Sequence, residues 1–235
     1  MTSPEFLPVL SSGSHDSPHE GACVMEYVSL LAGEAWSDTP SCTHPVLARA
    51  AQVVNDGLTN SERPALVPLI GRLFGTAEVG SDPERQVLTV RLLVWSARQV
   101  QHLVASKDQV VCDEAIAAAQ AWASEPNATN KEQAARTANA AYTAYNLAAG
   151  AASAVAANAA ANAAGAAAGN ATSAAYTHTA STSAISAAYA HTASGIGFLT
   201  GLLDEYDRLT GRTDTDTDPD AAERAQALYV TAVAT

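Results

Sequence analysis

The architecture of this chain depends on residues 148–169, which read AAGAASAVAANAAANAAGAAAG. They lie inside a longer tract, 137–203, that contains no Asp, Glu, Lys or Arg. Because alanine has the highest intrinsic helix propensity, such a tract is helical wherever glycine does not interrupt it. A single helix over 132–194 would be about 90 Å long, too long for a compact domain of this size. Breaks at Gly150 and at 165–169 therefore predict a long alanine-rich helical hairpin, in which small side chains let the two backbones approach closely.

Three other interpretations of the neutral tract are weaker. A membrane-spanning helix would place Asn158, Asn162 and His178 in hydrocarbon with few strongly apolar neighbours. A flexible linker is at odds with the helix propensity of alanine. An ice-binding or surface-binding helix over 171–194 would need threonine at one fixed spacing, which this stretch lacks.

An imperfect repeat reads AAYTHTAS at 174–181 and AAYAHTAS at 187–194. It supports regular helix in this part of the tract. The period of thirteen residues rotates the two copies to different helix faces. The repeat therefore does not indicate a solenoid or a repeated binding site.

Hydrophobic periodicity and capping residues predict further helices on both sides of the tract. Gly33 and Gly57 end two of them, because glycine readily adopts the left-handed conformation of a helix C-cap. Residues 81–84 combine a capping side chain, a proline in the first turn and acidic residues at the positive end of a helix dipole. Pro64 and Pro68 should kink the helix that contains them. The expected helices cover residues 20–31, 45–56, 62–74, 83–105, 109–124, 196–209 and 219–234. The chain is thus predicted to be all-α, a multi-helix bundle with a long alanine-rich hairpin.

Composition divides the chain into four segments. Residues 1–18 are rich in Ser, Pro and Gly and form an irregular N-terminal lead-in. Residues 19–125 form an N-terminal helical core, and residues 126–212 form the alanine-rich helical region. Residues 213–235 comprise an acidic loop and a C-terminal helix.

The charge balance limits the partners that the protein can have. Its 235 residues carry 24 acidic and 12 basic side chains, a formal net charge of −12, so nucleic-acid binding is not expected. Met1 to Leu10 contain no basic residue and no continuous apolar run, so no secretory signal is predicted. Three cysteines are too few for a disulfide scaffold, which fits a reducing compartment. We expect a cytoplasmic protein, or a virion protein if a phage encodes it, and no membrane partner.

Four residues near the N-terminus have the chemistry of zinc ligands. His19 and Cys23 lie four residues apart at the start of a predicted helix, and Cys42 and His44 follow in a C-x-H arrangement. Thiolate sulfur and imidazole nitrogen are the atoms that zinc accepts in tetrahedral sites. With all four ligands bound the metal would be structural, and it would pin the loop to the helix.

The same residues allow other interpretations. His15 is a fifth candidate ligand, and three ligands would leave an open position where zinc activates water with Glu26 as the base. In the metal-free interpretation, which the non-standard spacing favours, Cys23 is a small core residue and no cofactor is present. A Cys23–Cys42 disulfide fits a virion or an extracellular setting better than the cytosol. Nucleophilic catalysis by Cys23 with a nearby histidine lacks a recognisable motif.

Acidic residues alternate along 213–220 in the manner of the start of a calcium-binding loop. Pro219 stands where such a loop needs glycine, and Ala225 stands where it needs a bidentate glutamate. We therefore interpret the series as a solvated turn that begins the last helix. The alternating acids are Asp214, Asp216, Asp218 and Asp220.

Two stretches carry a family resemblance. Residues 13–56 contain GSHDSPHEGACVMEYVSLLAG followed by SDTPSCTHPVLARAAQVVND, and residues 202–212 read LLDEYDRLTGR. In both, the chain resembles a family of uncharacterised proteins encoded by actinobacteria and their phages, whose intervening helices are alanine-rich. The resemblance implies an actinobacterial or phage source and no particular activity.

The leading functional hypothesis is a non-enzymatic structural or assembly protein that interacts with other proteins through the alanine-rich hairpin. Small side chains suit close helix contacts, and the uncharged surface between 137 and 203 gains from being covered. We expect a homo-oligomer or a larger protein assembly. The alternative is a small metal-dependent enzyme, similar to a hydrolase, whose site is formed by His19, Cys23, Cys42 and His44.

Overall fold

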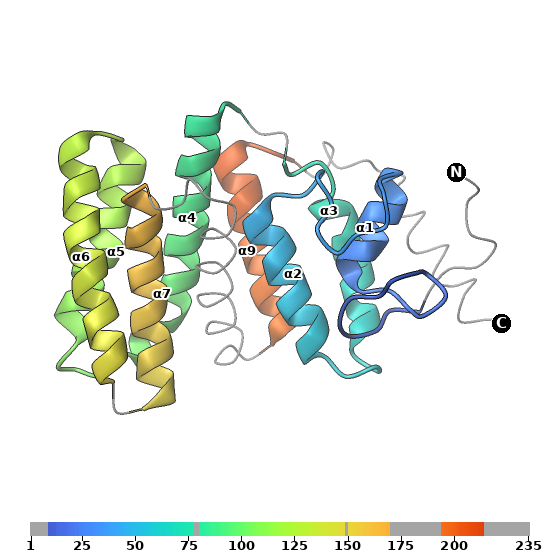
Figure 1. Cartoon of the computed structure of the whole chain (residues 1–235), viewed down its shortest axis with the longest axis horizontal. Helices are drawn as coiled ribbons and strands as arrows, with labels where there is room; N and C mark the ends of the chain where they lie inside the picture. The colour runs from blue at the N-terminus through green and yellow to red at the C-terminus, as the bar shows by residue number, and fades with distance from the viewer. Residues whose placement is uncertain (1–8, 78–79, 149, 170–193, 214–235) are drawn as a thin grey trace. The chain divides into compact units, whose positions relative to one another are not determined.

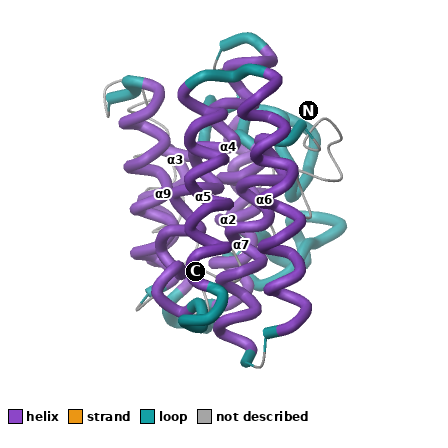
Figure 2. Tube along the Cα trace, turned by 90° about the vertical axis from the view of Figure 1, so that its left-hand side faces the viewer, coloured by secondary structure: helices purple, strands orange, loops and turns teal. Residues whose placement is uncertain are grey.

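The computed structural model describes residues 9–77, 80–148, 150–169 and 194–213. Within these ranges the elements are helices, no named strand occurs, and Leu10 forms an isolated bridge with Ala22. Figure 2 shows this helical content along the described trace, and the predicted all-α class is confirmed. Three predictions lie outside the described residues: the repeat that begins at residue 174, the acidic series that begins at Asp214, and the helix over 219–234.

Contacts divide the chain into two compact units. One unit comprises residues 1–78 together with 199–235, and the other comprises residues 79–198. This grouping differs from the segments drawn from composition. The helices α4 (Asp82–Val100) and α5 (Gln109–Ser124), assigned there to the N-terminal core, pack instead against the alanine-rich helices.

In the first unit, short helices pack around a core of large aliphatic side chains. α1 (Val24–Ala32) contacts both α2 (Pro45–Gly57) and α3 (Val67–Leu73). α9 (Gly195–Thr210) contributes its apolar face to this unit from Leu199 onward. Fully buried large side chains of the unit include Met25, Leu47, Leu66, Ile70, Leu73, Leu199, Leu202, Leu203 and Tyr206.

Helix α1 begins later than its periodicity predicts. It starts at Val24 instead of residue 20, because Cys23 forms the N-cap. The Cys23 Sγ atom accepts the N–H of Glu26, and the Glu26 carboxylate accepts the N–H of Cys23, which together make a capping box. Gly33 ends the helix as predicted, with a left-handed φ of 69°.

The helix predicted over 62–74 forms in two pieces. η1 (Arg63–Leu66) is a 3-10 turn, and α3 follows it. Pro64 and Pro68 each lack the N–H that would bond to the preceding turn, so a regular helix cannot continue through both. The predicted interruption is confirmed.

Polar contacts between distant residues fix α9 in the first unit. The Tyr206 hydroxyl donates to the carbonyl of Thr76 at 2.9 Å, across 130 positions of sequence. The Arg72 guanidinium pairs with Asp204 at 2.8 Å and with Asp207 at 2.6 Å. The first unit is therefore built from residues in the N-terminal part of the chain together with α9.

In the second unit, α4, α5, α6 (Ala128–Leu147) and α7 (Ala151–Ala167) form an antiparallel bundle (Figure 1). Short loops join consecutive helices, so neighbours run in opposite directions. α6 ends at Leu147, α7 begins at Ala151, and the two helices pack together as the predicted alanine-rich hairpin. The glycine at 150 thus acts as the predicted break.

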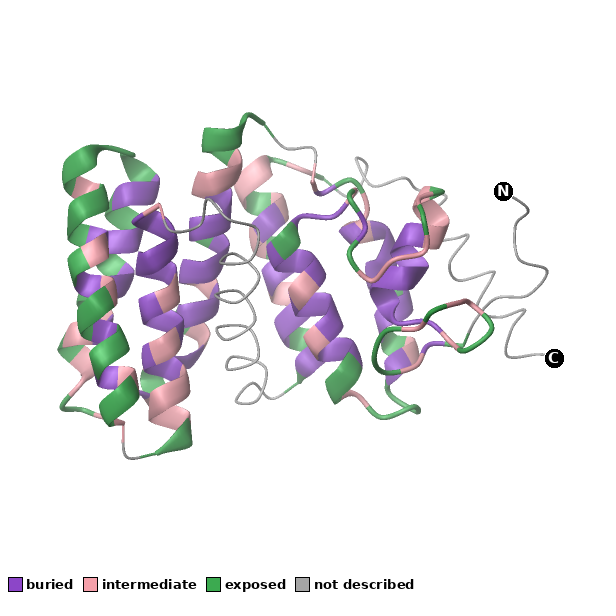
Figure 3. Cartoon of the chain, in the orientation of Figure 1, coloured by how far each residue is buried: buried purple, intermediate pink, exposed green. Residues whose placement is uncertain are grey.

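Helix α7 packs against all three of its partners in this bundle, α4, α5 and α6. Most of its length is buried, as Figure 3 shows. Each methyl group contributes little area, so contacts along the whole helix replace large side chains as the source of cohesion. The buried residues of α7 are Ala156, Ala157, Ala159, Ala160, Ala161, Ala163, Ala164, Gly165, Ala166 and Ala167. No helix in the described ranges is long and apolar enough to cross a membrane.

Candidate functional site

Two of the four predicted zinc ligands cap helices. Cys23 is buried, and its Sγ accepts the Glu26 N–H at 3.4 Å. His44 is also buried, and its Nδ1 accepts the N–H of Val46 at 3.3 Å at the start of α2. The backbone N–H of His44 donates to the hydroxyl of Thr76 at 2.8 Å. Both residues therefore serve the backbone of the element that follows them.

The other two predicted ligands lie in loops. Cys42 is half-buried, with its Sγ 3.7 Å from the Thr43 hydroxyl and its N–H bonded to Glu34 at 2.9 Å. His19 is exposed. All three cysteines of the chain are free thiols, so the Cys23–Cys42 disulfide is not formed in this structure.

The described ranges contain no group of three or more His, Cys, Asp or Glu side chains that could hold a metal ion. Burial raises the pKa of Cys23 to about 12 and also raises the pKa of Cys42, which favours the thiol over the thiolate that zinc binds. The zinc set remains a prediction, which elemental analysis of the purified protein tests.

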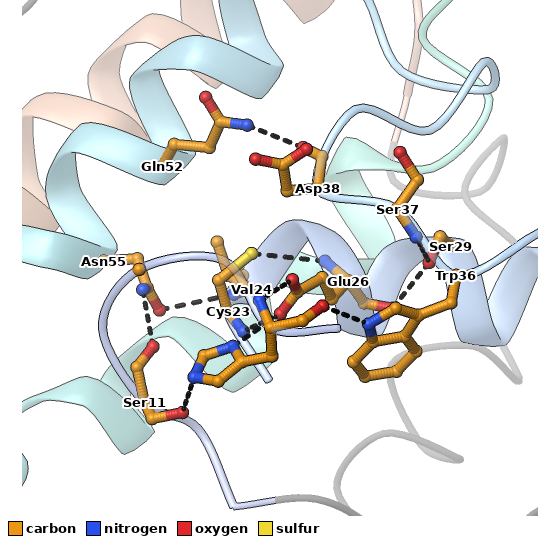
Figure 4. Close-up of polar contacts among 12 residues, drawn as sticks. Ser11, Cys23, Val24, Glu26, Ser29, Trp36, Ser37, Asp38, Gln52 and Asn55 are labelled. Atoms are coloured by element: carbon orange, nitrogen blue, oxygen red, sulfur yellow. Dashed lines mark hydrogen bonds and ion pairs between the residues drawn. The ribbon is translucent and has the colours of Figure 1, made fainter. Parts of the chain in front are cut away.

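The structure instead gathers polar groups around Glu26, as Figure 4 shows. Glu26 is 1% exposed. Its carboxylate accepts the N–H of Cys23 at 2.7 Å, the N–H of His15 at 2.6 Å and the His15 ring Nδ1 at 2.9 Å. Hydrogen bonds from these donors compensate the desolvation of a buried charge.

Ser11 extends this network beyond the His15 ring. Its Oγ lies 2.9 Å from His15 Nε2, on the side of the ring opposite the nitrogen that faces Glu26. The three side chains thus form a continuous chain of hydrogen bonds from a half-buried hydroxyl to a buried carboxylate. We call Ser11, His15 and Glu26 the Ser–His–Glu relay.

Backbone contacts hold the relay in place. The Ser11 N–H donates to the carbonyl of Ala22 at 2.8 Å, and the Asn55 side chain donates to the Ser11 carbonyl at 2.8 Å. The Trp36 indole donates to the His15 carbonyl at 2.8 Å. Segments from three parts of the chain therefore fix the positions of both Ser11 and His15.

Gly21 allows the close approach of these segments. Its φ of 124° favours glycine. A β-carbon at this position would collide with Ser11 Oγ and would lie 3.2 Å from His15 Nε2. The absent side chain therefore leaves room for the hydroxyl–imidazole pair.

Sequence reasoning named two members of the relay but not their relation. His15 was a spare metal ligand and Glu26 a base beside a metal, while Ser11 was not singled out. The C-x-x-E spacing of Cys23 and Glu26 is a capping-box spacing with cysteine in the place of serine, and it was the local signal for the position of Glu26.

A second feature lies at one end of the bundle formed by α4 to α7. Large apolar side chains are exposed there: Val110 by 66%, Tyr142 by 54% and Leu147 by 68%. The Tyr142 ring packs against Tyr145, with 5.6 Å between centroids. We call Val110, Tyr142, Tyr145 and Leu147 the apolar end.

No protein-family model, no curated protein and no solved structure matches this chain.

Proposed function

We propose that the protein is a structural or assembly protein that associates with further copies of itself through the apolar end. The observation that supports this proposal is the exposure of Val110, Tyr142 and Leu147 on neighbouring helices. Exposed large apolar side chains are typical of interaction sites, and aromatic residues are enriched in protein interfaces.

Val110 and Tyr142 lie at similar levels of the bundle, and Leu147 lies five residues further along α6. α5 ends at Ser124 and α6 begins at Ala128, and the two helices run antiparallel. Val110 is fourteen residues before Ser124, and Tyr142 is fourteen residues after Ala128. Each therefore lies about 21 Å along its helix from the connecting turn. The two side chains can contribute to one surface.

Charge is distributed as an interface requires. α6 carries no charged residue after Arg136, so Tyr142, Tyr145 and Leu147 stand on its neutral half. On α5, exposed Glu114 lies one turn from Val110. An apolar centre with charged residues beside it matches the arrangement of core and rim in protein interfaces.

The small number of exposed apolar side chains fits a moderate affinity at most. Complete burial of one large apolar side chain contributes about 1.5–3 kcal/mol. Association costs about 4–15 kcal/mol in lost translational and rotational freedom. Burial of the apolar end on two copies offsets this cost, and we expect a dissociation constant on the order of micromolar.

Light scattering at tens of micromolar protein tests the proposal, because the wild-type mass should exceed the 24.1 kDa of one chain. Leu147→Glu and Tyr142→Glu should return the mass to that of the monomer, since each places a charge in the contact. Thr129→Glu is the matched control, being exposed on the same helix at its other end, and should leave the mass unchanged. A monomeric wild-type protein contradicts self-association, and an oligomer that resists both apolar-end substitutions contradicts the assignment of the surface.

A further inference from the structure

We infer that the Ser–His–Glu relay is a catalytic site, beyond the assembly role, at which Ser11 transfers the acyl group of a neutral or cationic ester to water. The geometry that carries this inference is a hydroxyl, an imidazole and a carboxylate joined in that order. The two links, Ser11 Oγ to His15 Nε2 and His15 Nδ1 to Glu26 Oε2, both measure 2.9 Å. This is the arrangement of nucleophile, base and orienting acid in acyl-transfer enzymes, which recurs on unrelated folds.

The hydrogen bonds define the tautomer of His15. The carboxylate of Glu26 only accepts hydrogen bonds, so the nitrogen that faces it, Nδ1, must carry the proton. In the neutral ring Nε2 then has a free lone pair and accepts the hydroxyl proton of Ser11. The relay thus orients the serine proton toward the base before a substrate arrives.

Glu26 is the most buried of the three residues, and His15 and Ser11 are both more exposed, as the reaction needs. Glu26 is 1% exposed, the His15 side chain is 11% exposed, and Ser11 is half-buried at the outer end. A carboxylate shielded from water stabilises the imidazolium that forms during the reaction more strongly than an exposed one. The backbone bonds of Ser11 and His15 reduce the reorganisation that the reaction requires.

The reaction proceeds in two balanced halves. Ser11 Oγ bonds to the carbonyl carbon of the ester while His15 Nε2 takes the hydroxyl proton. The bond from that carbon to the alkoxy oxygen then breaks, and the imidazolium gives its proton to the departing alcohol. Water attacks the acyl-serine in the same way, with its proton passing to Nε2 and then to Ser11 Oγ, and the carboxylic acid leaves. Glu26 orients the ring through Nδ1 and takes up no proton in either half.

Local charge indicates the class of substrate. Residues 9–48, which hold all three members, contain no Lys or Arg. The exposed side chains near the relay in sequence include the acids Asp16 and Glu20. An anionic acyl group would meet repulsion here, whereas a neutral or cationic one would not.

Covalent labelling of the wild-type protein tests the site without depending on a variant. A fluorophosphonate phosphonylates an activated serine as fluoride leaves, so intact-mass and peptide mass spectrometry should find one adduct, on Ser11. Ser11→Ala should abolish that adduct, and His15→Asn should slow it by about a hundredfold or more, the usual contribution of a general base. Ser12→Ala, which changes an exposed neighbouring serine, should be labelled like the wild type. No adduct, or an adduct on another serine, overturns the proposal.

Hydrolysis of p-nitrophenyl acetate gives an independent readout. The wild type should show a saturable rate, and Ser11→Ala should reduce kcat at least about a hundredfold. An acyl chain that ends in a carboxylate should be hydrolysed more slowly than acetate. Circular dichroism should show that Ser11→Ala retains the fold, since residue 11 keeps its backbone hydrogen bonds. A rate that is equal in the wild type, Ser11→Ala and Ser12→Ala overturns the proposal.

Discussion

Glu26 is the residue on which the N-terminal loop depends. Its carboxylate is buried, and it accepts backbone N–H groups from both His15 and Cys23. It therefore joins the loop to the first turn of α1. Without the carboxylate, these backbone N–H groups would be buried without an acceptor, which would lower the stability of the folded state.

Glu26→Ala should lower the free energy of unfolding by about 1–3 kcal/mol, since it leaves buried donors unpaired. Urea denaturation followed by circular dichroism measures this change. Glu20→Ala removes an exposed carboxylate from the same loop and should change stability by less than about 0.5 kcal/mol. Equal effects of the two substitutions would contradict the bridging role of Glu26.

Tyr206 makes the stability sensitive to alkaline pH. Burial raises its pKa to about 12, above the ordinary value of 10. The folded state therefore holds the phenol proton more tightly than the unfolded state. This contribution is fully present below pH 10 and is lost as the pH rises toward 12.

Tyr206→Phe removes both the titration and the hydrogen bond to the Thr76 carbonyl. At neutral pH the variant should be less stable by about 1 kcal/mol. Between pH 9 and 12 it should lose less stability than the wild type, although Tyr27 and Cys23, whose pKa values burial also raises to about 12, still contribute. Urea denaturation across this range measures the difference. An identical loss in both proteins would show that Tyr206 does not titrate as described.

At the scale of elements, α7 shows how a helix without large side chains can form the centre of a bundle. Ala160 and its neighbours are fully buried, and α4, α5 and α6 all contact the helix. Close packing leaves no room for additional methylene groups at such positions. Alanine here is a steric requirement as well as a source of helix propensity.

Ala160→Leu should therefore destabilise the protein by about 1–3 kcal/mol through overpacking. Ala151→Leu provides the matched control, because residue 151 is exposed at the start of the same helix. Its effect should be within about 0.5 kcal/mol. Thermal or urea unfolding compares the two, and a neutral Ala160→Leu would argue against tight packing around α7.

Proline and glycine residues at the ends of helices allowed some helix ends to be predicted from the sequence. Pro126 after Glu125 marks the end of α5, and Gly33 marks the end of α1, and both ends lie where expected. The start of α1 was misplaced because Cys23 caps it, an uncommon residue for that role. The hairpin followed from alanine propensity and the glycine at position 150.

The Ser–His–Glu relay could not be predicted in the same way. It depends on the conformation of residues 11–22, which the bridge between Leu10 and Ala22 and the positive φ of Gly21 help to set. Hydrophobic periodicity carries no information about such a loop, because the loop is held by hydrogen bonds between residues that are distant in the sequence. The side-chain bond from Asn55 to Ser11, 44 positions away, is one example.

At the scale of the whole molecule, charge and apolar surface are separated along the chain. The formal charge of −12 comes from residues outside 137–203. Net charge favours solubility and opposes nonspecific association, so the proposed contact between copies is expected where charge is sparse. On α6, Tyr142, Tyr145 and Leu147 of the apolar end lie within this uncharged tract.

The account rests centrally on α7 as an ordered and buried helix, and amide hydrogen exchange of the full chain tests this most directly. Opening of α7 should require unfolding of its bundle, so the amides of residues 156–167 should exchange at least about a thousandfold more slowly than in an unstructured chain. Exchange of these amides at the rate of an unstructured chain would contradict the buried helix, and with it the bundle that presents the apolar end.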